Sequence, residues 1–166
     1  MENKLIDTLI DTLKKETDLY EGIQKLSKNK TDAIVEGKVS ELESITSLEQ
    51  SMILKLGKLE EEREKLVEQI ALQLNVKASD ITITNLKERF SGEQAEKLNG
   101  CHNTLSKLVN ELSTANELNS KLIRNSLDYI DFSINLLTDA GSTGNNYGTS
   151  GMSSNLKKRN FFDIKL

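Results

Sequence analysis

Two residue types are missing from this chain of 166 residues: it contains no Pro and no Trp, and aromatic residues make up only 4%. A hydrophobic core must therefore consist mainly of Leu and Ile. Charged residues reach 29%, and Lys, Glu, Leu, Asn and Ser are abundant. This composition is typical of long amphipathic helices, and the length fits one domain with a sizeable core.

Cysteine and histidine occur once each, as the neighbours Cys101 and His102. A single Cys excludes a disulfide within the chain and favours a reducing compartment. Adjacent residues of a helix diverge by about 100°. We therefore interpret the pair as a small buried thiol beside a solvated imidazole, and not as a nucleophile or a metal site.

Other patterns of catalytic or cofactor chemistry are missing as well. The glutamates of residues 60–64 surround a helix and alternate with Arg63 and Lys65, which favours a solvated face over a metal site. No Gly-rich run follows a strand and opens a helix, as a phosphate-binding loop would require. We expect no enzymatic activity, no metal and no cofactor.

Long apolar runs and a basic stripe are also lacking. No segment reaches the apolar length needed to cross a bilayer, and the first 13 residues alternate charged with apolar residues, unlike a secretory signal. The net charge of −4 argues against a general nucleic-acid binder. We expect a cytoplasmic protein that neither inserts into membranes nor binds nucleic acid.

Apolar residues recur at helical spacing in three long stretches, which predicts an all-α fold: an antiparallel bundle of three long helices with coiled-coil-like packing. The first helix is expected from Glu2 to Glu36, followed by a tight reversal at Gly37. The second is expected to begin at a capping box of Ser40 and Glu43.

The connection after the second helix is expected to begin at Asn75. Residues 81–84 are all β-branched, which weakens helix formation, so we expect an extended stretch there. A short helix is expected to follow over residues 85–90. Ser91 and Gln94 form a second capping box, which predicts the start of the third long helix.

The third long helix carries the widest apolar face of the chain. Steps of three and four residues place twelve residues on one stripe: Leu98, Cys101, Leu105, Leu108, Leu112, Ala115, Asn119, Ile123, Leu127, Ile130, Ile134 and Leu137. Three successive steps of four after Ala115 form a stutter, which turns the apolar face around the helix. Tyr129, Phe132 and Leu136 broaden the face further. We expect its second half to serve more than the internal core.

Arg63 occupies an apolar seam position of the second helix. Its guanidinium either extends outward along its stem or meets amides and carbonyls, and Asn116, Asn119 and Ser126 are the candidate partners. We assign Arg63 and Asn116 a structural role in fixing the register of the bundle.

The composition changes after residue 140. Gly, Ser, Thr and Asn dominate the following stretch, which is typical of a flexible linker. We divide the chain into a helical bundle, 1–140, and a flexible C-terminal recognition tail, 141–166. The basic run of residues 157–159 fits either a contact with nucleic acid or acidic membrane, or a solvated terminus.

Three features occur together in the C-terminal half: the stretch of residues 115–123 (ANELNSKLI), the apolar run to Leu137, and the stretch of residues 146–151 (NYGTSG). With them the chain resembles the FlgN family of flagellar export chaperones. The resemblance implies a cytoplasmic chaperone that holds flagellar hook-associated (hook-filament junction) proteins before type III export. It would bind a helical terminal segment of such a client and deliver it to the export gate.

The resemblance also implies two sites. We expect the client to bind at Asn119, Leu122, Ile123, Leu127, Ile130, Ile134 and Leu137. We expect the gate component FlhA to bind at Tyr147, Gly148 and Gly151. The long second connection and the Phe161-Phe162 pair leave open whether the tail contacts client, gate or both.

Three alternatives remain. The apolar residues of the third helix fit an ordinary core as well as a binding groove. The chain also fits a structural coiled-coil protein that self-associates without a client, and a homodimer is compatible with either function.

Overall fold

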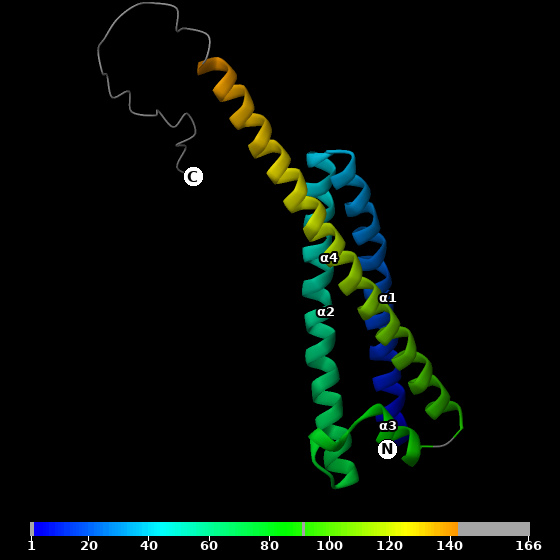
Figure 1. Cartoon of the computed structure of the whole chain (residues 1–166). Coiled ribbons are helices and arrows are strands. Elements are labelled where there is room, and N and C mark those ends of the chain that lie inside the picture. The colour runs from blue at the N-terminus through cyan, green and yellow to red at the C-terminus, as the bar shows by residue number, and fades with distance from the viewer. Residues whose placement is uncertain (1, 91, 143–166) are drawn as a thin grey trace, which may run out of the picture. The chain divides into compact units, whose positions relative to one another are not determined.

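The computed structural model describes the backbone of residues 2–90 and 92–142, and the side chains of residues 4–90 and 92–139. Every regular element in this range is helical, which confirms the all-α class (Figure 1). The elements are α1 (Glu2–Val35), α2 (Val39–Leu74), the 3₁₀ turn η1 (Ala78–Asp80), α3 (Ile83–Arg89) and α4 (Glu93–Ser142).

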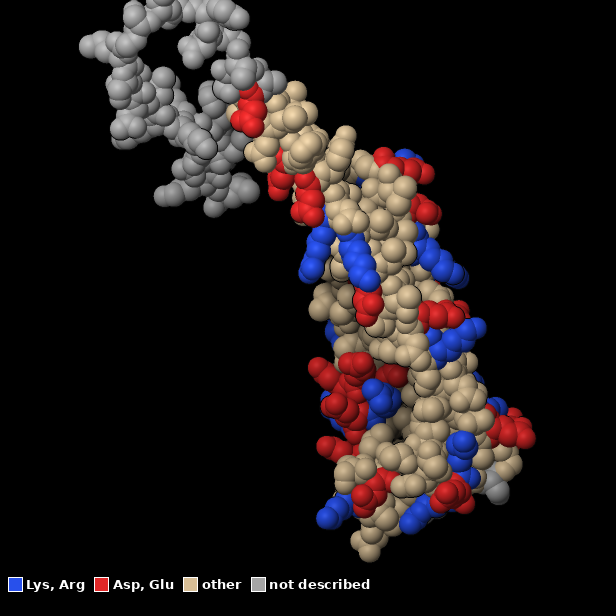
Figure 2. Space-filling view, in the orientation of Figure 1, with Lys and Arg blue, Asp and Glu red and all other residues tan. Residues whose placement is uncertain are grey.

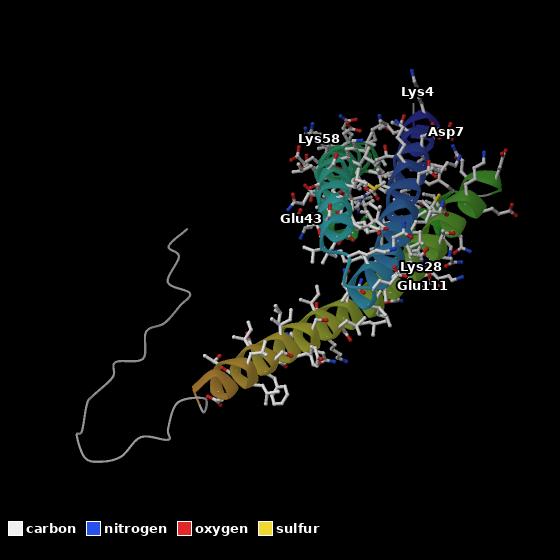
Figure 3. All side chains as sticks on the ribbon, turned by 90° about the horizontal axis from the view of Figure 1, so that it is seen from above. Lys4, Asp7, Lys28, Glu43, Lys58 and Glu111 are labelled. Atoms are coloured by element: carbon white, nitrogen blue, oxygen red, sulfur yellow. The ribbon has the colours of Figure 1, made fainter. Side chains whose placement is uncertain are left out.

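The contacts divide the chain into two units, Met1–Leu127 and Asp128–Leu166, so α4 contributes to both. In the first unit, α1, α2 and the first part of α4 lie side by side (Figure 1). Charged residues such as Glu43 and Lys58 lie on the outer side of α2 (Figure 3). No helix in the described part of the chain is long and apolar enough to span a membrane.

The reversal between α1 and α2 forms at the predicted glycine. Gly37 has a φ of 68°, its N–H donates to the carbonyl of Ile34 at 3.2 Å, and the N–H of Lys38 donates to the carbonyl of Ala33 at 2.9 Å. This pair of bonds satisfies the last carbonyls of α1 and turns the chain sharply.

The predicted capping box of Ser40 and Glu43 is wrong. Because the reversal is so tight, α2 already begins at Val39, with Lys38 at the N-cap and no side-chain cap. Ser40 therefore lies inside the first turn of the helix. The second predicted box cannot be judged, since Ser91 lies outside the described residues.

The second connection is more helical than predicted. The expected extended stretch ends early because α3 begins at Ile83, where Thr82 caps the helix by accepting a hydrogen bond from the N–H of Asn85 at 3.1 Å. This cap outweighs the weak helix preference of the β-branched residues. Ile81 and Ile83 are partly buried and pack against the core.

The core of the first unit contains two apolar clusters. The larger one joins α1, α2, α3 and α4 through Ile6, Leu9, Ile10, Leu13, Ile70, Leu86 and Leu98. The smaller one joins Ile23 of α1, Leu56 of α2 and Leu112 of α4. Near the smaller cluster the two helices α1 and α2 approach so closely that a Cβ on Gly22 would collide with the methyl group of Met52.

Two ion pairs join α1 to α2. Along α1, one lies between the two clusters and the other lies beyond the smaller cluster. Glu16 pairs with Arg63 of α2, and Lys30 pairs with Glu49 of α2. These partly buried pairs favour one register of the two helices, because a shift would leave a charge without its partner.

Candidate functional site

The apolar stripe of α4 changes from buried to exposed along the helix. In the first unit Leu98, Leu108 and Leu112 are at most 7% exposed, and Asn119 is 3% exposed. Leu122 is half-buried, whereas Ile123 and Leu127 are 37% and 56% exposed. The stripe therefore serves as core only as far as Asn119 and its neighbour Leu122.

The second unit exposes the apolar residues that the sequence placed beyond the internal core. Six large apolar side chains are between 43% and 74% exposed: Tyr129, Ile130, Phe132, Ile134, Leu136 and Leu137. We call these six residues the 129–137 surface. These residues are therefore not part of the internal core, whereas the further role expected of this part of α4, including the client contact, stays a prediction.

The 129–137 surface consists of two neighbouring strips. At about 100° per residue, Tyr129, Phe132 and Leu136 form one strip, and the other three residues form the second. Together they cover about 200° of the helix, which is wider than the stripe that packs against a single helix. Ser133 lies between the strips, and its hydroxyl donates to the carbonyl of Tyr129 at 2.8 Å. Its polar group is thereby turned to the backbone.

The remaining side of this helix segment is polar and acidic. Asp128, Asp131 and Asp139 lie there with Asn135 and Thr138. Thr138 donates to the carbonyl of Ile134, so its hydroxyl is also satisfied within the helix. The segment is therefore amphipathic, with one wide apolar side and one acidic side.

Asn119 holds α4 against α1. Its amide nitrogen donates to the carbonyl of Ser27 at 3.1 Å, and its amide oxygen accepts from the hydroxyl of Thr31 at 2.7 Å. With both ends of the amide bonded and the side chain buried, Asn119 acts within the protein. A client contact by Asn119 remains an untested prediction.

Arg63 has a different partner from those expected. Its Nε donates to Glu16 of α1 at 2.9 Å, whereas Asn116 is exposed and Asn119 is bonded to α1. The expected partners on the third long helix were therefore wrong. Burial raises the pKa of the Glu16 carboxyl, and the Arg63 guanidinium opposes that rise. A carboxylate attracts a guanidinium more strongly than a neutral amide does.

Cys101 and His102 differ in exposure. Cys101 is half-buried against the larger apolar cluster, and burial raises the pKa of its thiol, whereas His102 is exposed. A raised pKa keeps the thiol protonated and unreactive. Within the residues described, no group of three or more His, Cys, Asp or Glu side chains could hold a metal ion.

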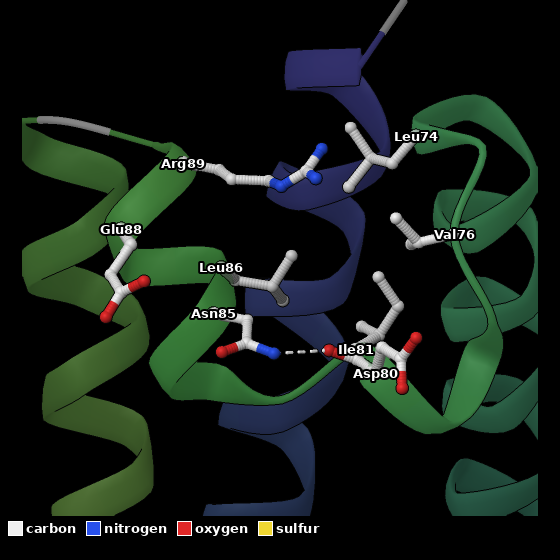
Figure 4. A pocket seen from close by; sticks show the side chains of 8 residues that line it. All are labelled: Leu74, Val76, Asp80, Ile81, Asn85, Leu86, Glu88 and Arg89. Atoms are coloured by element: carbon white, nitrogen blue, oxygen red, sulfur yellow. Dashed lines mark hydrogen bonds between the residues drawn. The ribbon is translucent and has the colours of Figure 1, made fainter.

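A hollow that the sequence did not predict lies beside α3. It has a volume of about 260 Å³, and Leu74, Val76, Ile81 and Leu86 form its apolar wall. Arg89 extends across it, while Glu88 points away (Figure 4). Its walls come from α2, α3 and the segment between them, so no single sequence motif marks it.

The predicted gate-binding residues, Tyr147, Gly148 and Gly151, lie outside the described residues. Most of the predicted tail, 141–166, lies outside them as well, so the predicted domain boundary stays a prediction.

Comparisons with known proteins identify the family. The model of the FlgN protein family matches residues 1–155. The chain is 31% identical over 129 residues to the uncharacterized protein YvyG of Bacillus subtilis (strain 168), and the match covers 78% of each chain. No solved structure matches the chain. With nearly its whole length matched by the family model, the chain belongs to the FlgN family.

Proposed function

We propose that the chain is a cytoplasmic chaperone for flagellar hook-associated proteins, and that it delivers them to FlhA at the export gate. Membership of the FlgN family implies the general role, that of a flagellar export chaperone. The client, the binding surface and the delivery step are the parts that we propose.

The observation that carries the proposal is the exposed 129–137 surface. Six large apolar side chains within nine consecutive residues face solvent, and a concentration of this kind on a protein surface marks an interaction site. An amphipathic client helix can lie on such a strip with apolar residues at every third or fourth position. The helix would be shielded from assembly while it stays bound.

The width of the surface also favours a client. Fully burying one Leu or Ile side chain contributes about 1.5–3 kcal/mol, and the two strips offer six large side chains. A single client helix covers one strip, and a helical hairpin or a client helix with a second apolar edge covers both. The chaperone thus binds without any covalent chemistry.

Replacing two exposed leucines tests the surface. Leu136→Ser with Leu137→Ser should weaken binding of a purified hook-associated protein by about tenfold or more, because each strip loses one large apolar contact. Isothermal titration calorimetry measures the dissociation constant. Since these side chains are 60% and 74% exposed, circular dichroism should show unchanged helix content.

A matched control exists on α2. Leu54 and Leu72 are 71% and 80% exposed, so Leu54→Ser with Leu72→Ser removes the same chemistry elsewhere. This control should bind the client as the unmodified chain does. Equal weakening by both pairs would contradict the assignment of the surface. Sedimentation could instead show a stable higher oligomer that dissociates when Leu136 and Leu137 are replaced. That result would show that the surface serves self-association.

The delivery step is tested separately at Tyr147. An aromatic side chain gives a large contact area for little loss of rotamer freedom, and the family resemblance is the ground on which we propose a gate contact at Tyr147. Tyr147→Ala should weaken binding to purified FlhA by at least about tenfold, the usual effect of losing a hot-spot residue. Client affinity should stay unchanged, and an equal loss of both affinities would refute the separation of the two sites.

A further inference from the structure

Within residues 128–139, the charges beside the 129–137 surface are all of one sign. The nearest basic residue along α4 is Arg124, one turn before Asp128. At about 100° per residue, Asp128 and Asp139 border the strip that contains Phe132, and Asp131 lies beyond the other strip on the Ile134 side. Acidic side chains thus flank both edges of the apolar surface. In Figure 2 the visible surface of this last described part of α4 shows red and tan atoms but no blue ones.

Two of these carboxylates, one at each edge, have no basic ion-pair partner among the side chains that the structure describes. The sequence contains no Lys, Arg or His between residues 125 and 156. Among the described side chains, neither Asp128 nor Asp131 forms an ion pair. Some exposed acidic residues of the first unit differ in this respect, since Glu93 and Glu111 have lysine partners on the same helix.

We infer that the 129–137 surface binds a basic amphipathic helix, in which Lys or Arg side chains flank an apolar stripe. This inference rests on the proposed function and specifies the chemistry of the client segment. Apolar side chains of the partner cover the strips, and its basic side chains reach the carboxylates at the edges. Charge complementarity of this kind sets orientation and discriminates between partners more than it adds affinity.

The same charges disfavour a second copy of the chain as the occupant. Two such surfaces packed together would bring acidic edges near each other, and like charges at close range are repulsive. A separate partner with basic edges meets no such repulsion, so the carboxylates select it against acidic helices.

The test uses two synthetic amphipathic helical peptides that share one Leu stripe and differ only in flanking Lys or Glu residues. The full-length chain should bind the Lys peptide about tenfold more tightly than the Glu peptide at low salt, measured by fluorescence anisotropy. The preference should fall to about threefold or less near 0.5 M salt, where charges are strongly screened.

A charge reversal completes the test. Asp128→Lys with Asp131→Lys should reverse the preference, so that the Glu peptide binds more tightly. Glu61→Lys with Glu64→Lys makes the same charge change on exposed positions of α2 and should leave the preference intact. Both variants should fold, because Lys is a better helix former than Asp and matches Glu.

The outcomes separate this inference from the function on which it rests. If both peptides bind equally well, the charge inference is overturned and the apolar surface stands. If neither binds, the 129–137 surface is not a docking site and both fail. An equal effect of the two charge reversals would assign the preference to net charge and overturn the inference. A dimer that competes with the Lys peptide would overturn it too, by making a second copy the occupant.

Discussion

At the scale of single residues, polar side chains fix how α4 lies on α1. Asn119 bonds Ser27 and Thr31 of α1 at a buried position. A buried amide of this kind tolerates only one register, because a shift of the helix would leave its polar atoms without partners. The contact therefore fixes the register of α4 on α1 near the end of its packed part.

Replacing Asn119 should cost stability without touching the exposed surface. Asn119→Ala removes two hydrogen bonds and leaves a small cavity, so the free energy of unfolding should fall by about 1–3 kcal/mol in urea titrations. Asn110→Ala makes the same change at an exposed residue of the same helix and should stay within about 0.5 kcal/mol. If the two variants were equally stable, Asn119 would have no structural role.

Sequence reasoning identified the special residues of the interior but not their partners. Asn119 and Arg63 are visible in the sequence as polar residues within apolar stripes. Their partners, Ser27 and Glu16, lie on α1, and the pairing depends on the relative register of two helices. Periodicity within one helix contains no information about that register.

At the scale of helices, the ends are determined by local backbone chemistry. Gly37 adopts a φ of 68° and Asn75 a φ of 53°, and both residues close a helix with the same pair of backbone hydrogen bonds. Glycine enters this left-handed region without steric cost, and Asn enters it more easily than other residues.

Two glycines should respond oppositely to alanine. Gly37→Ala should lower the free energy of unfolding by about 1 kcal/mol, since a Cβ is strained at positive φ. Gly57 lies inside α2, and a Cβ added there would meet nothing within 4 Å apart from its chain neighbours and the nearby backbone of its own helix. Gly57→Ala should therefore raise the free energy of unfolding by about 0.5–1 kcal/mol. Thermal unfolding followed by circular dichroism measures both. A loss at both positions would show that Gly57 has a packing role.

The C-terminal ends of the long helices were easier to predict than the starts of the helices. The first two long helices end within one residue of their predicted limits, because a Gly at the reversal and long apolar periodicity are strong signals. Ser40 failed as a cap because a tight reversal leaves no room for one. Thr82 was not recognised as an N-cap, because its β-branched neighbours favoured an extended stretch over a helix start.

At the scale of the whole molecule, the two units differ in what their apolar residues do. Many of those in the first unit build two buried clusters among four helices, although others such as Leu54 and Leu72 are exposed. All six of the 129–137 surface face solvent. The sequence predicted a surplus of apolar width on α4. It could not indicate where burial stops, since an exposed and a buried heptad have the same periodicity.

The most direct test of the account is hydrogen exchange of the full chain, alone and with saturating hook-associated protein. The account predicts that the client slows amide exchange in the part of α4 after residue 127 and leaves α1 and α2 unchanged, because bound helices open less often. Binding that slows exchange in α1 or α2 while residues 128–142 exchange as before would contradict the account.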